Sequence, residues 1–118
     1  MILYDTSYLF EEVMNGKIPE GCVLDLTLYE FGNILWKNLV LKKKGSLEDV
    51  TETMNFLLDL DLEIIRVEKE DFTEILKIAV ENKITIYDAA YIYIARKKGL
   101  ILKTLDKKLQ KIYRLLRK

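Results

Sequence analysis

The sequence predicts an α/β fold, with a short, mostly parallel sheet and helices packed on both of its faces. Four apolar runs have the length of short buried strands and alternate with longer segments whose apolar residues recur at helical spacing. The runs are residues 2–4, 22–24, 62–67 and 100–103. Strands that alternate with amphipathic helices are typical of a parallel sheet covered on both faces. Because the chain has 118 residues, we expect a single domain over residues 1–118.

Turn and cap signals divide the segments between these strands into helices. We expect helices over residues 8–14, 27–43, 46–60, 68–82, 85–98 and 106–116. Thr27 and Glu30 have the spacing of a capping box at the start of the second helix, and Gly45 follows its end. Gly99 follows a basic last turn, which is a common way for a helix to end.

Two of the expected helices carry apolar stripes that indicate which face is buried. The residues expected to face inward from the helix over 68–82 are Phe72, Ile75, Leu76, Ala79 and Val80. The helix over 27–43 has a first stripe of Leu28, Phe31, Leu35 and Leu39 and a second stripe of Tyr29, Trp36 and Val40. The second stripe is either further core or a surface that contacts another polypeptide, and the sequence leaves both readings open.

The composition restricts the chemistry that the chain can perform. It contains no histidine, which excludes Ser-His-Asp and Cys-His catalysis. With Cys22 as the only cysteine, a tetrahedral zinc site is nearly excluded and an internal disulfide is impossible, so we expect Cys22 to be a buried apolar residue. The 19 carboxylates remain, and carboxylate oxygens favour hard cations such as Mg²⁺ or Mn²⁺.

The sequence also carries expectations about location. No apolar run approaches the roughly 20 residues that a membrane span needs. The first residues include acids and lack the basic region and cleavage site of a signal peptide. We therefore expect a cytoplasmic protein that does not associate with a membrane.

Four acids stand at the ends of the expected elements. They are Asp5 after the first strand, Glu30 early in the second long helix, Asp88 at the start of a nearly all-apolar helix and Asp106 after the last strand. In sheets of this type, ligands bind beyond the carboxyl ends of the strands, where the strand order reverses. Each acid also has an ordinary structural alternative, as a helix cap or as the partner of a capping hydroxyl.

Short motifs surround these acids, in an order along the chain that resembles a known family. The motifs are Asp5-Thr6-Ser7 after a strand, Glu30 in the second long helix, Tyr87-Asp88-Ala89-Ala90 at a helix start, and Thr104-Leu105-Asp106 with Leu109 after the last strand. Together they resemble the PIN domain family and, within it, the VapC-type toxin ribonucleases of prokaryotic toxin–antitoxin modules. The resemblance covers essentially the whole chain.

This resemblance implies a PIN-like three-layer α/β/α sandwich with a four-stranded sheet. It implies a metal-dependent endoribonuclease that hydrolyses RNA phosphodiester bonds and leaves a 5′-phosphate and a 3′-hydroxyl. The implied ligands of Mg²⁺ or Mn²⁺ are Asp5, Glu30, Asp88 and Asp106, accompanied by the hydroxyls of Thr6, Ser7 and Thr104. The implied partners are an RNA substrate, a VapB-type antitoxin and a second copy of the chain in a homodimer.

Two alternatives compete with this interpretation. A response-regulator receiver has a similar layout, but it needs a phosphoacceptor aspartate at the end of the third strand, where this chain has Val67 and Glu68. The second alternative is a PIN-like module without catalytic activity that serves as a binding or structural partner. The presence of all four acids argues against that alternative.

The net charge of zero conceals an uneven distribution along the chain. Residues 96–118 hold ten basic residues and one acid, whereas residues 1–95 hold nine basic residues and 18 acids. A basic segment beside an acidic body fits the approach of a polyanion. We expect the RNA backbone to be guided by Lys103, Lys107, Lys108 and Lys111. The alternative is an ordinary solvated helix face.

Overall fold

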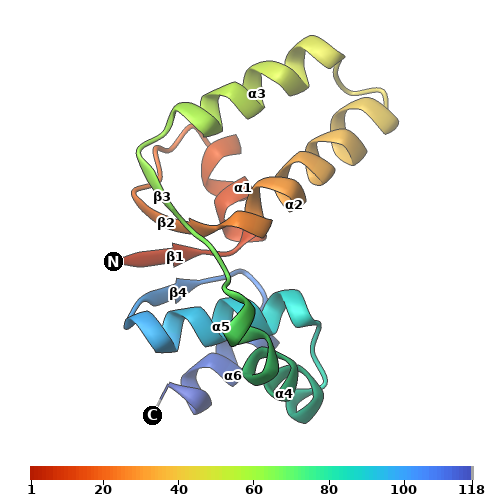
Figure 1. Cartoon of the computed structure of the whole chain (residues 1–118). Coiled ribbons are helices and arrows are strands. Elements are labelled where there is room, and N and C mark those ends of the chain that lie inside the picture. Colours follow the sequence, from red (N-terminus) through yellow and green to blue (C-terminus); the bar gives the residue numbers. More distant parts are fainter. Residues whose placement is uncertain (118) are drawn as a thin grey trace.

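The computed structural model describes residues 1–117 and confirms the predicted three-layer α/β/α architecture (Figure 1). Its strands are β1 (Ile2–Tyr4), β2 (Gly21–Leu24), β3 (Leu62–Ile65) and β4 (Ile101–Lys103). They form one four-stranded sheet of order β3-β2-β1-β4, in which every neighbouring pair is parallel. The third strand ends two residues earlier than predicted.

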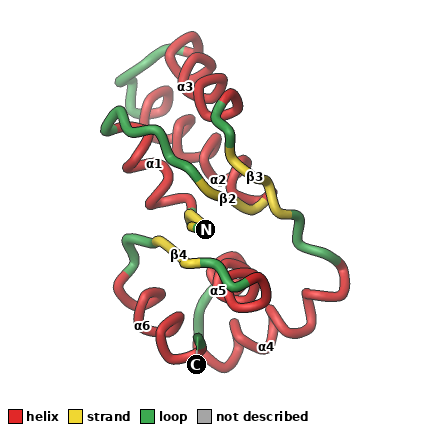
Figure 2. Tube along the Cα trace, turned by 90° about the vertical axis from the view of Figure 1, so that its left-hand side faces the viewer, coloured by secondary structure: helices red, strands yellow, loops and turns green. Residues whose placement is uncertain are grey.

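Helices cover both faces of this sheet (Figures 1 and 2). One layer contains α1 (Thr6–Met14), α2 (Asp25–Leu35), its continuation as the π-helix η1 (Trp36–Leu41), and α3 (Leu47–Asp59). The other layer contains α4 (Phe72–Asn82), preceded by the 3-10 turn η2 (Lys69–Asp71), together with α5 (Ile86–Lys98) and α6 (Lys107–Leu116). Within residues 1–117, no helix combines the length and apolarity that a membrane span requires.

Alternating residues of the strands build a hydrophobic core on each face of the sheet. Cys22 and Leu24 of β2 pack with the apolar side chains of α4, α5 and α6. Val23, between them in sequence, packs on the opposite face with Leu9 of α1 and Phe31 of α2. This alternation is the two-residue period of a strand buried on both faces. The expectation that Cys22 is a buried apolar residue is confirmed, since its thiol is fully enclosed.

The strand order places the reversal of the sheet between β1 and β4. The chain moves outward from β1 through β2 to β3 and then crosses back to add β4 on the other side of β1. Asp5 follows β1 directly, and its backbone N–H donates to the carbonyl of Lys103 at the end of β4, at 3.1 Å. The segment from Thr104 to Asp106 therefore begins beside Asp5, at the edge where such sheets bind ligands.

The predicted start of the second long helix is wrong. The helix begins at Asp25, so Thr27 lies inside its first turn instead of capping it. The strand passes directly into the helix, and the Thr27 hydroxyl accepts a hydrogen bond from the N–H of Leu24, the last strand residue, at 3.1 Å. The expected capping box with Glu30 does not form, because the Glu30 carboxylate is turned toward Thr6.

The predicted inward face of α4 is correct only in part. Ile75 and Ala79 are buried as expected, and Ile78, which was not predicted, is buried with them. The exposed residues are Phe72 (50%), Leu76 (54%) and Val80 (70%). These three are spaced four residues apart and form a separate, exposed stripe on α4.

Candidate active site

A cleft of about 540 Å³ at the carboxyl ends of β1 and β4 brings the predicted acids together. Its lining includes Asp5, Glu30, Asp88 and Asp106, with Thr6 and Ser7 between them. The four acids come from the junction of β1 and α1, from α2, from the first turn of α5, and from the loop before α6. Residues separated by up to about a hundred positions thus meet at the reversal of the sheet.

Asp5 and Asp106 each cap a helix through one carboxylate oxygen. The Oδ1 atom of Asp5 accepts from the N–H of Tyr8 at 2.9 Å, so α1 begins at Thr6, two residues earlier than predicted. The Oδ1 atom of Asp106 accepts from the N–H of Leu109 at 3.0 Å at the start of α6. For both acids, no hydrogen bond to Oδ2 occurs among the described residues. The capping role therefore coexists with one oxygen that remains open to a ligand.

Glu30 is held by two hydroxyl groups on one of its oxygens. Its Oε1 atom accepts from the hydroxyl of Thr6 at 2.8 Å and from the hydroxyl of Tyr91 at 3.2 Å. Thr6 is buried beside Asp5, and Tyr91 lies on α5 one turn beyond Asp88. The orientation of Glu30 is thus set by elements that also carry two of the other acids.

Asp88 lies in the first turn of α5, where its N–H donates to the Oγ1 atom of Thr85, the N-cap residue, at 3.1 Å. Burial raises the pKa of the Asp88 carboxyl above its ordinary value. The negative charges of Asp106, Asp5 and Glu30 raise this pKa further, in that order. Asp88 therefore lies close enough to the other three acids for their charges to act on it.

All three predicted hydroxyl residues contact the acid residues. Ser7 Oγ donates to Oδ1 of Asp5 at 3.0 Å, and Thr6 donates to Glu30. Thr104 is buried outside the lining of the cleft, and its Oγ1 accepts from the backbone N–H of Asp106 at 3.1 Å. Thr104 thereby fixes the loop that presents Asp106, whereas Thr6 and Ser7 hold carboxylates directly.

The chemistry of this donor set fits a hard divalent cation. No three cysteine, aspartate or glutamate side chains of residues 1–117 form a ready-made metal site. Burial and the charges of the neighbouring acids both raise the pKa of Asp88, and a divalent cation among these acids would compensate their negative charge. Oxygen-only donors suit Mg²⁺ or Mn²⁺, and the open Oδ2 atoms of Asp5 and Asp106 are available to bind one.

The family model of the PIN domain matches residues 5–115. This chain belongs to the PIN domain family. Two relatives of this PIN domain come from Pyrobaculum aerophilum. Exonuclease VapC9 is 37% identical over 93 residues, which cover 74% of this chain and 62% of the relative. Ribonuclease VapC3 is 35% identical over 98 residues, which cover 80% of this chain and 72% of the relative.

The crystal structure of PAE2754 from Pyrobaculum aerophilum has the same fold as this PIN domain. The two structures align with a TM-score of 0.75 and 30% sequence identity, over 94% of this chain and 78% of the other. The chain spans less than two thirds of the length of VapC9.

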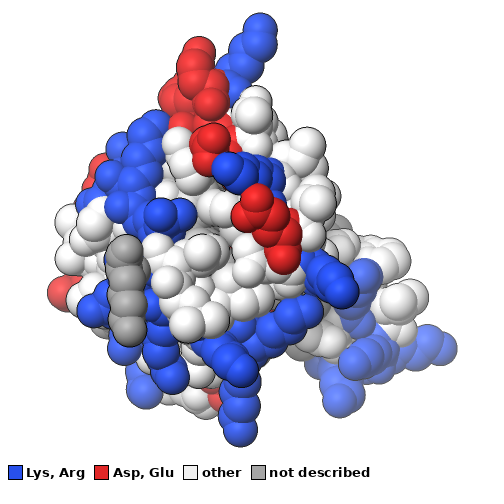
Figure 3. Space-filling view, turned by 90° about the horizontal axis from the view of Figure 1, so that it is seen from below, with Lys and Arg blue, Asp and Glu red and all other residues white. Residues whose placement is uncertain are grey.

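The four lysines expected to guide RNA lie outside the acidic cleft. Lys103, Lys107, Lys108 and Lys111 are all exposed. Lys103 lines a neighbouring cavity of about 320 Å³ together with Thr104. Viewed from below, Lys and Arg outnumber Asp and Glu on the visible surface (Figure 3). None of the four lysines is among the residues that line the cleft.

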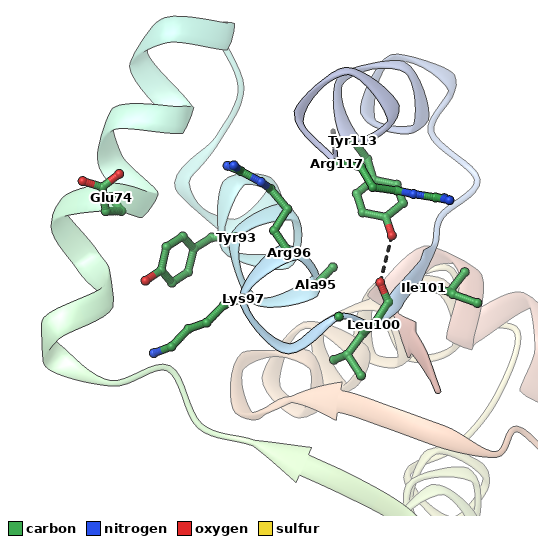
Figure 4. Close-up of a pocket in the computed structure, with 10 residues that line it drawn as sticks. Glu74, Tyr93, Ala95, Arg96, Lys97, Leu100, Ile101, Tyr113 and Arg117 are labelled. Carbon is green, nitrogen blue, oxygen red and sulfur yellow. Dashed lines mark hydrogen bonds between the residues drawn. The ribbon is translucent and has the colours of Figure 1, made fainter.

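A larger cavity lies elsewhere. It measures about 660 Å³ and is lined by residues of α4, α5, the start of β4 and the C-terminal end of α6 (Figure 4). Arg96 and Arg117 line it, with Glu74 as its single acid. None of the predicted site residues belongs to it, so the acidic cleft is the better candidate for catalysis despite its smaller volume.

Sequence reasoning missed two buried hydroxyl residues of the site, Thr27 and Tyr91. Burial raises the pKa of Tyr91, so its hydroxyl keeps its proton. A tyrosine on the buried side of a nearly all-apolar helix is itself a signal, because its hydroxyl needs a hydrogen-bond partner. The partner could not be named, since Thr27 and Tyr91 are 64 residues apart.

In metal-free buffer at about pH 7, Asp88→Asn is expected to be more stable than the wild type by about 0.5–1 kcal/mol. The pKa of Asp88 in the folded protein is raised above its ordinary value of 3.8. The stability contributed by the protonated carboxyl is therefore fully present below pH 3.8 and is lost as the pH rises through the raised pKa. Asparagine does not ionise and suffers no such loss. Thermal unfolding at several pH values measures the difference in stability between the two proteins, which should close in acid. A difference that widens in acid would contradict the raised pKa of Asp88.

Proposed function

We propose that this PIN domain protein is a metal-dependent endoribonuclease. The observation that carries the proposal is the meeting of Asp5, Glu30, Asp88 and Asp106 in one cleft at the reversal of the sheet. The names of the relatives, an exonuclease and a ribonuclease, support nuclease chemistry. The alternative of an inactive PIN-like module is disfavoured, because a module without a metal would not need acids in the cleft that keep one carboxylate oxygen free of hydrogen bonds.

In this proposal, each acid has a role that follows from how it is held. Asp5 and Asp106 are principal ligands of Mg²⁺ or Mn²⁺, because capping fixes one oxygen of each and leaves the other open. Glu30 and Asp88 hold the ion directly or through water. When bound, the ion supplies an activated water and positive charge for the phosphodiester. The expected products carry a 5′-phosphate and a 3′-hydroxyl.

The basic residues around the cleft would bind the RNA backbone. Lys107 and Lys111 are exposed on α6, which Asp106 caps, and Lys103 ends the strand β4. Lys108 donates to the backbone carbonyl of Lys83 at 3.2 Å and is therefore partly engaged within the protein. Contacts of this kind to phosphates release counterions, so RNA affinity should fall as salt increases.

Removal of the metal is expected to lower RNA cleavage by at least about 100-fold. The substrate is a labelled circular single-stranded RNA, incubated with Mg²⁺ or with EDTA. A circle has no ends, so its opening shows endonucleolytic cleavage, and an exonuclease would leave it intact. A linear RNA of the same sequence is the control. Equal cleavage in Mg²⁺ and in EDTA would contradict the metal dependence. Cleavage of the linear RNA without opening of the circle would show that the protein is an exonuclease instead of an endonuclease.

We further propose that the protein is the cytoplasmic toxin of a VapBC-type pair, which forms a homodimer and binds a VapB-type antitoxin. The second apolar stripe of α2 and η1 supports an interface. Its residues Tyr29, Trp36 and Val40 are 84%, 50% and 38% exposed, so the alternative that the stripe is core is wrong. Exposed apolar residues on one helical face are typical of a surface that contacts another polypeptide.

Trp36→Glu is expected to convert the dimer into a monomer, because it places a charge in the centre of the exposed stripe. Light scattering during gel filtration measures the mass in solution. Leu115→Glu is a matched control, since Leu115 is 66% exposed on α6, in the opposite helical layer. A dimer that persists in Trp36→Glu would exclude Trp36 from that interface; loss of antitoxin binding in the same variant would then assign the stripe to the antitoxin.

A further inference from the structure

The hydroxyl of Tyr91 is the centre of a buried hydrogen-bond network that ends on Glu30. It lies 2.6 Å from Oγ1 of Thr27, 3.0 Å from Oγ1 of Thr6 and 3.2 Å from Oε1 of Glu30. Tyr91 is 2% exposed and Thr27 is fully buried, so water does not compete for the bonds of Tyr91 to Thr27 and Thr6, whereas the bond to Glu30 lies at the wall of the cleft. The network joins the end of β2, the start of α1, α2 and α5, which are the elements that build the acidic cleft.

The directions of these hydrogen bonds follow from the available protons. The N–H of Leu24 donates to Oγ1 of Thr27, and the only acceptor found for the Thr27 proton in residues 1–117 is the Tyr91 hydroxyl. The Thr6 proton goes to Glu30 at 2.8 Å. The single Tyr91 proton is then shared between Oε1 of Glu30 and Oγ1 of Thr6. Every proton in the network therefore points toward the carboxylate, and bonds aligned in this way strengthen one another.

This arrangement uses only one of the two oxygens of Glu30. Both side-chain donors bind Oε1. Oε2 accepts no hydrogen bond from the part of the chain that the structure describes, and Glu30 lines the cleft. Because Tyr91 follows Asp88 by about one helical turn on the rigid helix α5, the network also fixes the position of Glu30 relative to Asp88.

We infer that Tyr91 and Thr27 are positioning residues that hold Glu30 with its second oxygen turned toward the metal in the cleft. The inference rests on the proposed metal-dependent function. Both side chains are buried, so they act through the carboxylate that they orient. A purely structural tyrosine would stabilise the core without influencing the affinity for a cation.

The test is calorimetric titration of Mn²⁺ into the protein without RNA. Tyr91→Phe keeps the ring and removes only the hydroxyl, and we expect Mn²⁺ to bind about 10-fold more weakly, as is common when a partner of a metal ligand is lost. Tyr113→Phe is the matched control. Its hydroxyl is also largely buried, and it donates to the carbonyl of Leu100 at 2.8 Å, away from the acids (Figure 4). This variant should bind Mn²⁺ as the wild type does.

Thr27 provides a second comparison that does not depend on the aromatic ring. Thr27→Val keeps the shape but cannot relay the proton, so it should weaken Mn²⁺ binding, whereas Thr27→Ser keeps the hydroxyl and should restore it. In Tyr91→Phe, excess Mn²⁺ should recover most RNA cleavage, because the ligand itself is intact.

The possible outcomes separate the inference from the proposed function. If the wild type does not bind Mn²⁺, both are overturned. If the wild type binds Mn²⁺ and Tyr91→Phe binds it equally well, only the positioning role is overturned. The same holds if Tyr91→Phe and Tyr113→Phe weaken binding to the same extent, or if Thr27→Ser behaves like Thr27→Val.

Discussion

Asp5→Asn is expected to lower RNA cleavage by at least about 100-fold while the protein remains folded. Asparagine caps helices about as well as aspartate, so the bond from the N–H of Tyr8 that begins α1 can be kept. The substitution removes the negative charge and one of the two oxygens, and with them the proposed metal ligand. Activity and stability should therefore respond differently to this one change.

Cleavage of labelled RNA in Mg²⁺ measures the activity, and thermal unfolding measures the stability. Asp61→Asn is the matched control, because Asp61 is exposed and lies outside the cleft. It should cleave RNA at the wild-type rate. Cleavage by Asp5→Asn within a few-fold of the wild type would leave Asp5 with a capping role alone.

Gly21→Ala is expected to destabilise the fold by about 3 kcal/mol or more. A Cβ atom at Gly21 would lie 2.4 Å from the backbone carbonyl oxygen of Ile2, on the neighbouring strand β1. Gly21 also has a φ of +147°, a conformation that residues with a side chain rarely adopt. Relief of the clash would require β2 to move away from β1, the strand that leads to Asp5.

Urea unfolding measures this effect, and Gly32→Ala is its control. Gly32 lies within α2, where a Cβ atom would meet nothing within 4 Å. Alanine is the better helix former, so Gly32→Ala should gain up to about 1 kcal/mol. Similar stabilities for the two variants would show that the close approach of β1 and β2 at Gly21 is not a constraint on the fold.

The features that could be predicted from the sequence are those with local signals. Each strand is a short apolar run, and the last two helices begin within one residue of the predicted positions, because Thr85 and Asp106 are capping residues. The acids at the strand ends could be located because the apolar runs before them mark where the strands end. Once a parallel sheet is expected, the carboxyl ends of its strands must share one edge.

The errors arose where contacts distant in sequence decide the structure. Thr27 and Glu30 have capping-box spacing, but their side chains are directed to Leu24 and to Thr6, so the local rule failed. On α4, two apolar stripes compete, and only the packing against α5 determines that Ile78 is buried and Leu76 is not. No local pattern contains that information.

The site itself shows the same division. The acids stand in recognisable motifs, whereas the bond between Thr27 and Tyr91 that helps to hold Glu30 joins residues of different helices. Such supporting residues become visible only when the helices are packed. The site predicted from the sequence thus contained the charged groups and lacked part of the framework that orients them.

Anomalous diffraction from a crystal soaked in Mn²⁺ shows directly whether the four acids hold a divalent cation. We expect one or more peaks inside the cleft, with carboxylate oxygens of Asp5 and Asp106 at about 2.1 Å, as hard cations of this size require. Absence of a peak in the cleft, or a peak bound only by acids elsewhere on the surface, would contradict the proposed metal site.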